Sequence, residues 1–197
     1  MSYYPPIYGT IDREEPHFDL RELAVQTGMK LSSADETIQK AERQIREALD
    51  CKYSGIRVPV SISPKENVDL GFAGVQSHSL SLNLRDCDEA FVFAVTLGSG
   101  VDRVLNGLSM LSRAEHYLAD AVASVLAEDA CRIAAERLAQ GASVRPRFSP
   151  GFGDLELSFQ PMLLEAVNAA RYLGIGIGKT FLMSPMKSIT AIMGICK

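Results

Sequence analysis

No stretch of this 197-residue sequence reaches the roughly 20 consecutive apolar residues that a membrane-spanning helix requires. The first residues also lack the basic region and the apolar run of a secretory signal peptide. Both absences lead us to expect a cytoplasmic protein without a membrane partner. Hydrophobic residues nevertheless make up 47% of the chain, which is enough for a substantial core in one domain.

An excess of positive charge is missing as well. The chain carries 20 basic and 24 acidic residues, a net charge of −4, and has no run of Lys and Arg. We therefore expect no nucleic-acid partner. The four cysteines form no CxxC pair and match no zinc spacing, so we interpret them as buried thiols in a reducing compartment: Cys51, Cys87, Cys131 and Cys196.

Several catalytic and nucleotide-binding motifs are absent. Neither GxSxG nor HExxH occurs, and the histidines stand too far apart for a ligand set. A GxGxxG motif starting at Gly98 fails because Arg103 occupies the place of the third glycine. A Walker A loop ending at Lys179 fails because Leu173 occupies the place of the first glycine. Both segments are interpreted as ordinary glycine turns.

The N-terminal part of the chain predicts an extended arm followed by two helices. We expect residues 1–30 to form the arm and a short helix at 20–26, capped by Asp19 and ended by Gly28. Residues 31–197 are expected to form the main domain. Its first helix begins at Ser32 or Ser33, with an apolar stripe at these positions: Ile38, Ala41, Ile45, Ala48 and Leu49.

Further along, the pattern alternates between strands and helices. Residues 56–62 alternate like a strand, with Pro59 indicating an edge or a bulge, while residues 80–84 fit a strand or a helix equally well. The apolar run 90–95 predicts a strand buried on both faces, and 189–195 a final strand. Helices are expected at 101–108, 113–139 and 157–173, with a turn at 181–188.

The loop at residues 143–154 lies between the two longest helical patterns. It carries Arg145 and Arg147, two prolines that favour extended backbone, and two glycines that permit sharp turns. Such a loop suits a carboxylate or another anion, but an ordinary strand and tight turn would have the same composition. Glu128, on the preceding helix, either pairs with Arg132 four residues later or borders a cleft.

Three segments in this order resemble the activation domain of cobalamin-dependent methionine synthase, in its free-standing form. They are residues 126–128, then 147–152, which match Arg-x-Ala-Pro-Gly-Tyr, and 181–188, which match Met-x-Pro-x-x-Ser. The resemblance covers about residues 90–195. It implies an α+β fold with a twisted, largely antiparallel sheet and flanking helices.

The resemblance also implies a function. Such domains bind S-adenosylmethionine and present it to a corrinoid in the inactive cob(II) state, with an electron from flavodoxin or another donor. Cobalamin would come only through a partner, a methionine synthase or corrinoid protein. The matched cofactor-binding positions are Glu128, Arg147, Ser149, Gly151 and Phe152. Phe152 and Ala191 depart from the pattern, and the tyrosine of the family's C-terminal segment has no counterpart. The alternative is therefore a docking protein that has lost ligand binding.

Overall fold

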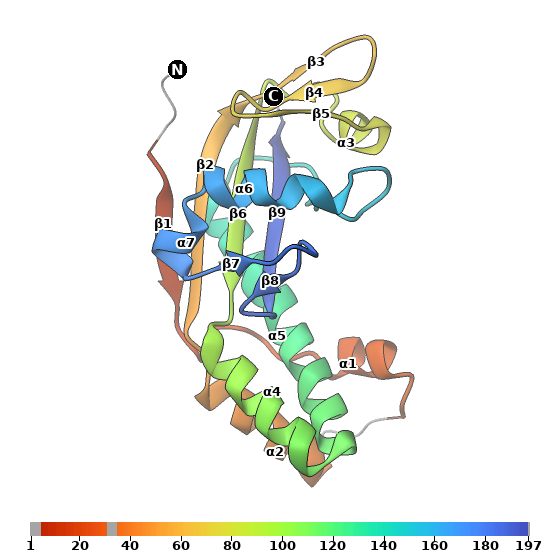
Figure 1. Cartoon of the computed structure of the whole chain (residues 1–197), viewed down its shortest axis with the longest axis vertical. Coiled ribbons are helices and arrows are strands. Elements are labelled where there is room, and N and C mark those ends of the chain that lie inside the picture. The colour runs from red at the N-terminus through yellow and green to blue at the C-terminus, as the bar shows by residue number, and fades with distance from the viewer. Residues whose placement is uncertain (1–4, 31–34, 197) are drawn as a thin grey trace.

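A computed structural model describes residues 5–30 and 35–196 of the chain. Its centre is an antiparallel sheet of four strands in the order β1-β2-β6-β9 (Figure 1). The bounds of these strands are β1 (Ile7–Ile11), β2 (Cys51–Pro59), β6 (Glu89–Thr96) and β9 (Ser188–Ile195). With helices on both sides, this confirms the predicted α+β class.

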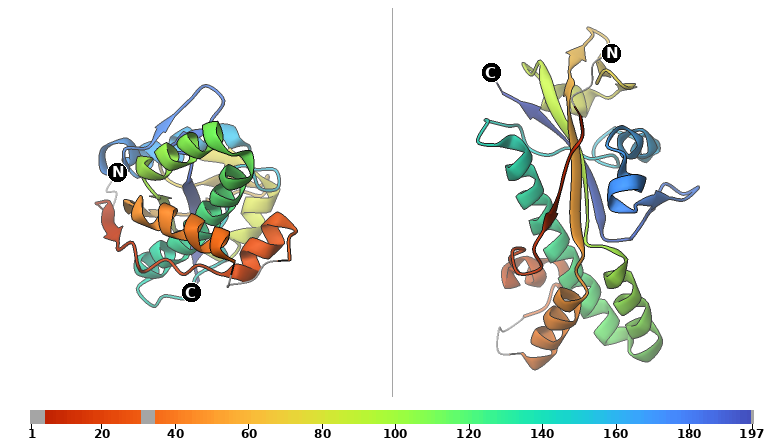
Figure 2. Two further views of the ribbon diagram at one scale, coloured as in Figure 1. Left: turned by 90° about the horizontal axis from the view of Figure 1, so that it is seen from below. Right: turned by 90° about the vertical axis from the view of Figure 1, so that its left-hand side faces the viewer.

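The two faces of the sheet belong to two separate cores. Helix α5 (Arg113–Ala139) packs on one face, and the short helices α6 (Gln160–Ala166) and α7 (Ala169–Leu173) pack on the other (Figure 2). Along β6, Phe93 points into the α5 core while its neighbour Val92 points into the α6 core. Because successive strand residues face opposite sides, a continuous apolar run is what this doubly covered strand needs.

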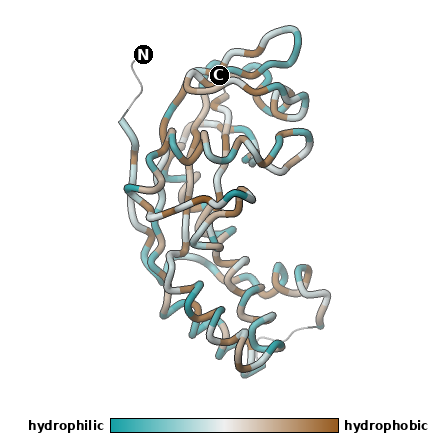
Figure 3. Tube along the Cα trace, in the orientation of Figure 1, coloured by the Kyte–Doolittle hydropathy of each residue, from teal (hydrophilic) through white to brown (hydrophobic). Residues whose placement is uncertain are grey.

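The lower end of the molecule is a group of amphipathic helices. Helices α1 (Leu20–Thr27), α2 (Glu36–Glu47) and α4 (Ser99–Leu111) pack against α5. Hydrophobic and hydrophilic residues both occur along the helices at this end (Figure 3). In the predicted stripe of α2, Ile38, Ala41 and Ile45 are buried, whereas Ala48 and Leu49 are only partly buried. The caps of α1 are Asp19 and Gly28, as predicted.

Two predicted helices need correction. The cap of α2 is Asp35, whose side chain accepts from the Thr37 N–H, and Ser32 and Ser33 lie outside the described residues. The helix expected at 157–173 is broken into a 3-10 turn η1 (Leu157–Phe159), α6 and α7. Asn168 between α6 and α7 has φ 52°, a left-handed conformation that interrupts the helix although the apolar periodicity continues.

The remaining segments are a short helix and two small sheets. Residues 80–83 belong to helix α3 (His78–Asn83) and Leu84 is its C-cap, so this segment is a helix and not a strand. Pro59 ends β2 and lies beyond Gly55, the last residue of β2 that pairs with β1 among the described residues, a position that suits a proline. A second sheet follows β2 and consists of β3 (Ser61–Ile62), β4 (Asn67–Asp69) and β5 (Gly74–Gln76). A two-stranded ribbon precedes β9 and consists of β7 (Gly176–Ile177) and β8 (Met183–Ser184).

The expected strand at 189–195 is β9, and the expected helices at 101–108 and 113–139 are α4 and α5. None of the helices in the described part of the chain is long and apolar enough to cross a membrane. A domain division at residue 30 stays a prediction, and α1 packs against α5.

Candidate functional site

The loop at 143–154 runs beside β9, the edge strand of the sheet. Arg145 N donates to Gly194 O at 2.8 Å, and Phe148 exchanges two backbone hydrogen bonds with Ile192 at 2.9 and 2.8 Å. The prolines at 146 and 150 hold this stretch extended, which suits pairing with a strand. The loop therefore covers an otherwise open sheet edge and is fixed to it at several points.

The second half of the loop is a tight turn. The Ser149 hydroxyl donates to Thr190 O on β9 at 2.7 Å, and Gly151 N donates to Leu155 O at 2.8 Å. Gly151 has φ 94° and Gly153 has φ 55°, backbone conformations that residues with a side chain rarely adopt. The turn is consequently held by its own hydrogen bonds and by β9.

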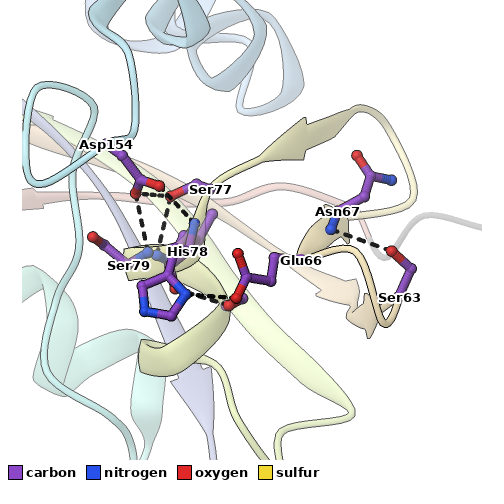
Figure 4. A network of polar contacts seen from close by, with 9 residues as sticks. Ser63, Glu66, Asn67, Ser77, His78, Ser79 and Asp154 are labelled. Carbon is purple, nitrogen blue, oxygen red and sulfur yellow. Dashed lines mark hydrogen bonds and ion pairs between the residues drawn. The ribbon is translucent and has the colours of Figure 1, made fainter.

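The end of the loop is anchored to helix α3 through Asp154. Its carboxylate accepts from the Ser77 hydroxyl at 2.6 Å and from the N–H groups of His78 and Ser79 at 2.7 and 3.0 Å (Figure 4). These hydrogen bonds, above all that from Ser77, hold the pKa of Asp154 well below its usual range. In the same network, His78 Nδ1 lies 2.6 Å from Glu66 Oε1.

Arg147 and Glu128 lie side by side. Arg147 Nη2 donates to Glu128 Oε2 at 3.2 Å, and their side chains are 33% and 54% exposed. The pairing of Glu128 with Arg132 considered from the sequence is wrong, because Arg132 is held by Asp129 at 2.7 Å and Glu136 at 2.8 Å. The structure thus brings the loop arginine and the helix carboxylate together at the border of a cleft.

That cleft is a groove of about 1040 Å³ between the end of α5, the loop and the edge of β9. Among the sequence-predicted residues, Glu128, Arg147, Ser149 and Phe152 line it. Gly151 is not a lining residue, and its N–H is already bonded to Leu155 O. Gly151 therefore shapes the turn that presents its neighbours rather than offering its own N–H to a ligand.

The groove has two chemically different ends. The end formed by α5 and the start of the loop is rich in charge: Glu128, Arg132, Glu136, Arg145 and Arg147. The end toward α6 combines apolar side chains with one amide and one hydroxyl: Pro150, Phe152, Leu157, Met183, Gln160 and Thr190. Such a groove suits a ligand that has a charged head and a flatter, less polar body. The sequence analysis missed Gln160, because a glutamine inside a helical pattern carries no distinguishing signal.

Cys131 lies one helical turn after Glu128 on α5 and is fully buried. Burial raises the pKa of its thiol to about 11, although the charge of Arg147 acts in the opposite direction. The thiol is therefore protonated near neutral pH. Cys131 packs in the α5 core beneath Arg147, and a buried, protonated thiol is a weak nucleophile.

A smaller hollow of about 570 Å³ lies on the other side of the Glu128–Arg147 pair, under α1. The His17 N–H donates to Asp129 Oδ2 at 2.7 Å and ties the N-terminal segment to α5 there. Burial alone would raise the pKa of Asp129, but the hydrogen bonds from Arg132 and His17 outweigh it and lower that pKa. Glu128 and Arg147 therefore line both hollows.

Comparison with solved structures shows a similar fold in the crystal structure of the MetH reactivation domain bound to AdoHcy. The TM-score is 0.74 with 12% sequence identity, over 96% of this chain and 78% of that one. This chain has the fold of the MetH reactivation domain. The fold predicted from the three matched segments is thereby confirmed. No protein-family model and no curated protein matches the sequence.

Proposed function

We propose that the groove binds S-adenosylmethionine and its product S-adenosylhomocysteine, through Glu128 and Arg147. The observation that carries the proposal is their contact at the charged end of the groove, 3.2 Å apart. The fold supports it, because the similar MetH domain holds AdoHcy. Both molecules carry an amino-acid group with a carboxylate and an ammonium, which are the charges that an arginine and a glutamate complement.

Binding would exchange one ion pair for two. The ligand carboxylate would take the forked N–H groups of Arg147, and its ammonium would take the Glu128 oxygens. A partly exposed pair such as this one contributes only about 0–1 kcal/mol, so separating its members costs little. The Glu128 carboxylate would also offset the positive charge of the sulfonium. Ser149 and Gly151 would hold the loop in the shape that places Arg147 over Glu128.

We further propose that the protein presents the bound methyl donor to a corrinoid carried by a partner, a cobalamin-dependent methionine synthase or a related corrinoid protein in the cytoplasm. One electron from flavodoxin or another reductant would convert cob(II) to cob(I), which takes the electrophilic methyl group and leaves S-adenosylhomocysteine. The contribution of this chain would be to bind the donor and orient it. The open groove and the exposed ring of Phe152 support access by a large partner.

Isothermal titration calorimetry with S-adenosylhomocysteine tests the binding step. The variants Arg147→Ala and Glu128→Gln should each weaken binding about 10- to 100-fold, the size of a lost hydrogen bond to a charged group. Arg103→Ala on α4, whose guanidinium bonds Ser99 and is remote from the groove, is the matched control and should bind normally. No heat from the unmodified protein at millimolar ligand would refute the proposal.

The second candidate is a docking protein that contacts a corrinoid protein without holding the methyl donor. Phe152 favours it, since its ring is 61% exposed at the groove and has no hydroxyl to bond a ligand. Co-purification with a corrinoid protein together with the absence of ligand heat would support this candidate. Ligand binding that depends on Arg147 would reject it.

A further inference from the structure

Gln160 has an unusual position for a polar side chain. It is 5% exposed, begins α6 and lines the groove. Its Oε1 accepts a hydrogen bond of 3.1 Å from the Thr190 hydroxyl. Within residues 5–30 and 35–196, no acceptor is found for its Nε2 hydrogens, yet Nε2 is not among the fully enclosed atoms that lack a partner. A nearly buried amide with unused donors at the surface of a groove is suited to a ligand.

The hydroxyl of Thr190 fixes the orientation of the Gln160 amide. Thr190 is 2% exposed on β9, and its main-chain oxygen accepts from the Ser149 hydroxyl at 2.7 Å. One strand residue thus holds both the loop and the amide. With the oxygen of Gln160 bonded to Thr190, the nitrogen is the part left for the groove.

Gln160 and Arg147 serve opposite ends of the groove. Arg147 contacts Glu128 on α5, which covers one face of the sheet, whereas Gln160 belongs to α6, which covers the other. The groove therefore passes around the edge of β9, from a charged end to an apolar end. The groove lining also includes Phe152, Leu157 and Met183, and Thr190, which bonds Gln160, lines it as well.

We propose that Gln160 is a specificity residue that donates from Nε2 to a ring nitrogen of the adenine base. The proposal rests on the proposed function, in which the amino-acid end of the ligand lies at Arg147. A purine is a flat ring that accepts apolar contacts on its faces and carries acceptor nitrogens on its edge. Apolar side chains match the faces of the ring, and the Gln160 amide supplies a neutral donor for its edge, since the hydroxyls of Ser149 and Thr190 donate within the protein.

The test separates the two ends of the ligand. S-adenosylhomocysteine, adenosine and methionine are titrated separately into the unmodified protein, Gln160→Met and Arg147→Ala, with protein-observed NMR for the two weak fragments. Gln160→Met keeps the length of the side chain and removes the donor. It should weaken the binding of S-adenosylhomocysteine and of adenosine about tenfold, which is the loss expected for one hydrogen bond. The affinity for methionine should be unchanged. Arg147→Ala should weaken the binding of methionine and leave the binding of adenosine unchanged.

Three further measurements separate the loss of the Gln160 donor from a loss of folding. Thermal unfolding of each variant shows whether it is folded, and Thr190→Val, which removes the hydroxyl that orients the amide, should weaken adenosine less than Gln160→Met does. On the ligand side, S-adenosylhomocysteine analogues with carbon in place of N1, N3 or N7 are titrated into the unmodified protein. One of the three should bind about tenfold more weakly, and this difference should vanish in Gln160→Met.

The outcomes are distinguishable. If S-adenosylhomocysteine does not bind the unmodified protein, the proposed function fails and this inference fails with it. If it binds through Arg147, but Gln160→Met and all three analogues bind as tightly as the originals, only the role of Gln160 is overturned. A tenfold loss that follows the adenosine fragment supports it.

Discussion

The Asp154 carboxylate accepts a 2.6 Å hydrogen bond from the Ser77 hydroxyl, 77 residues earlier in the sequence. The end of the groove loop thus adds to the capping of helix α3 by Ser77, because the first N–H groups of the helix bond to Asp154. At its other end the loop is bonded to β9. Arg147 stands between these two anchorages, so its position over Glu128 depends on contacts that are distant in sequence.

The substitution Asp154→Asn should make the free energy of unfolding depend less on pH in the acid range. The folded pKa of Asp154 is depressed below the unfolded value of about 3.9, so its contribution is present above that pH and is lost as the pH falls toward the folded pKa. Urea unfolding between pH 2.5 and 7 measures this. The unmodified protein should lose more stability below pH 4 than the Asn variant does, and parallel curves would contradict the capping role.

Gly153→Ala should destabilise the protein through a clash as well as backbone strain. A Cβ at Gly153, where φ is 55°, would lie 2.5 Å from Ser79 Oγ. Gly174→Ala is the matched control, because its φ of 67° is similar and nothing lies within 4 Å. We expect the free energy of unfolding to fall by about 1–2 kcal/mol in the control and by about 1–3 kcal/mol more in Gly153→Ala. Equal losses in chemical denaturation would show that the approach to Ser79 is unimportant.

Two glycines of helix α4 should respond in opposite directions. A Cβ at Gly100 would lie 2.3 Å from Ala48 O at the end of α2, whereas Gly107 has nothing within 4 Å. Gly107→Ala should stabilise by about 0.5–1 kcal/mol through helix propensity. Gly100→Ala should destabilise by about 1–3 kcal/mol, since backbone cannot move aside easily. Thermal unfolding of both variants checks this, and a stabilised Gly100→Ala would disprove the close packing.

The thiols should differ sharply in reactivity. Burial, with help from Asp50, raises the pKa of Cys51 to about 12, and burial raises that of Cys131 to about 11. Cys87 is buried too, whereas Cys196 is half-buried. At pH 8 an aromatic disulfide reagent should label Cys196 first and the other three after unfolding. Mass spectrometry of the labelled native protein checks the order, and early labelling of Cys131 would contradict it.

The raised pKa values of Cys51 and Cys131 also predict how the stability of the protein changes at alkaline pH. Cys51 and Cys131 keep their protons in the folded state to a higher pH than in the unfolded state, where the ordinary pKa is about 8.5. Their contribution to stability is therefore complete below about pH 8.5 and is lost as the pH rises toward the folded values. Cys131→Ala should reduce this alkaline loss in denaturant titrations at pH 8 and 10.

Much of the fold follows from local patterns. The run at 90–95 is a strand because β6 is covered on both faces, and the stripe of residues 113–139 is one helix from end to end. Where local patterns favour two structures equally, the sequence does not predict which of them forms. Residues 80–84 fit two structures, and the left-handed Asn168 breaks an apolar pattern that continues through it.

By itself, the sequence determined that residues 143–154 form a stiff, arginine-bearing loop between helices, because proline and glycine restrict and permit backbone angles locally. It also placed a carboxylate on the preceding helix. Only the tertiary structure decided that Glu128 faces Arg147 and not Arg132, and that the Gln160 amide borders the same groove. Those relations depend on which chain segments meet across the edge of β9, a long-range packing outcome that no local pattern encodes.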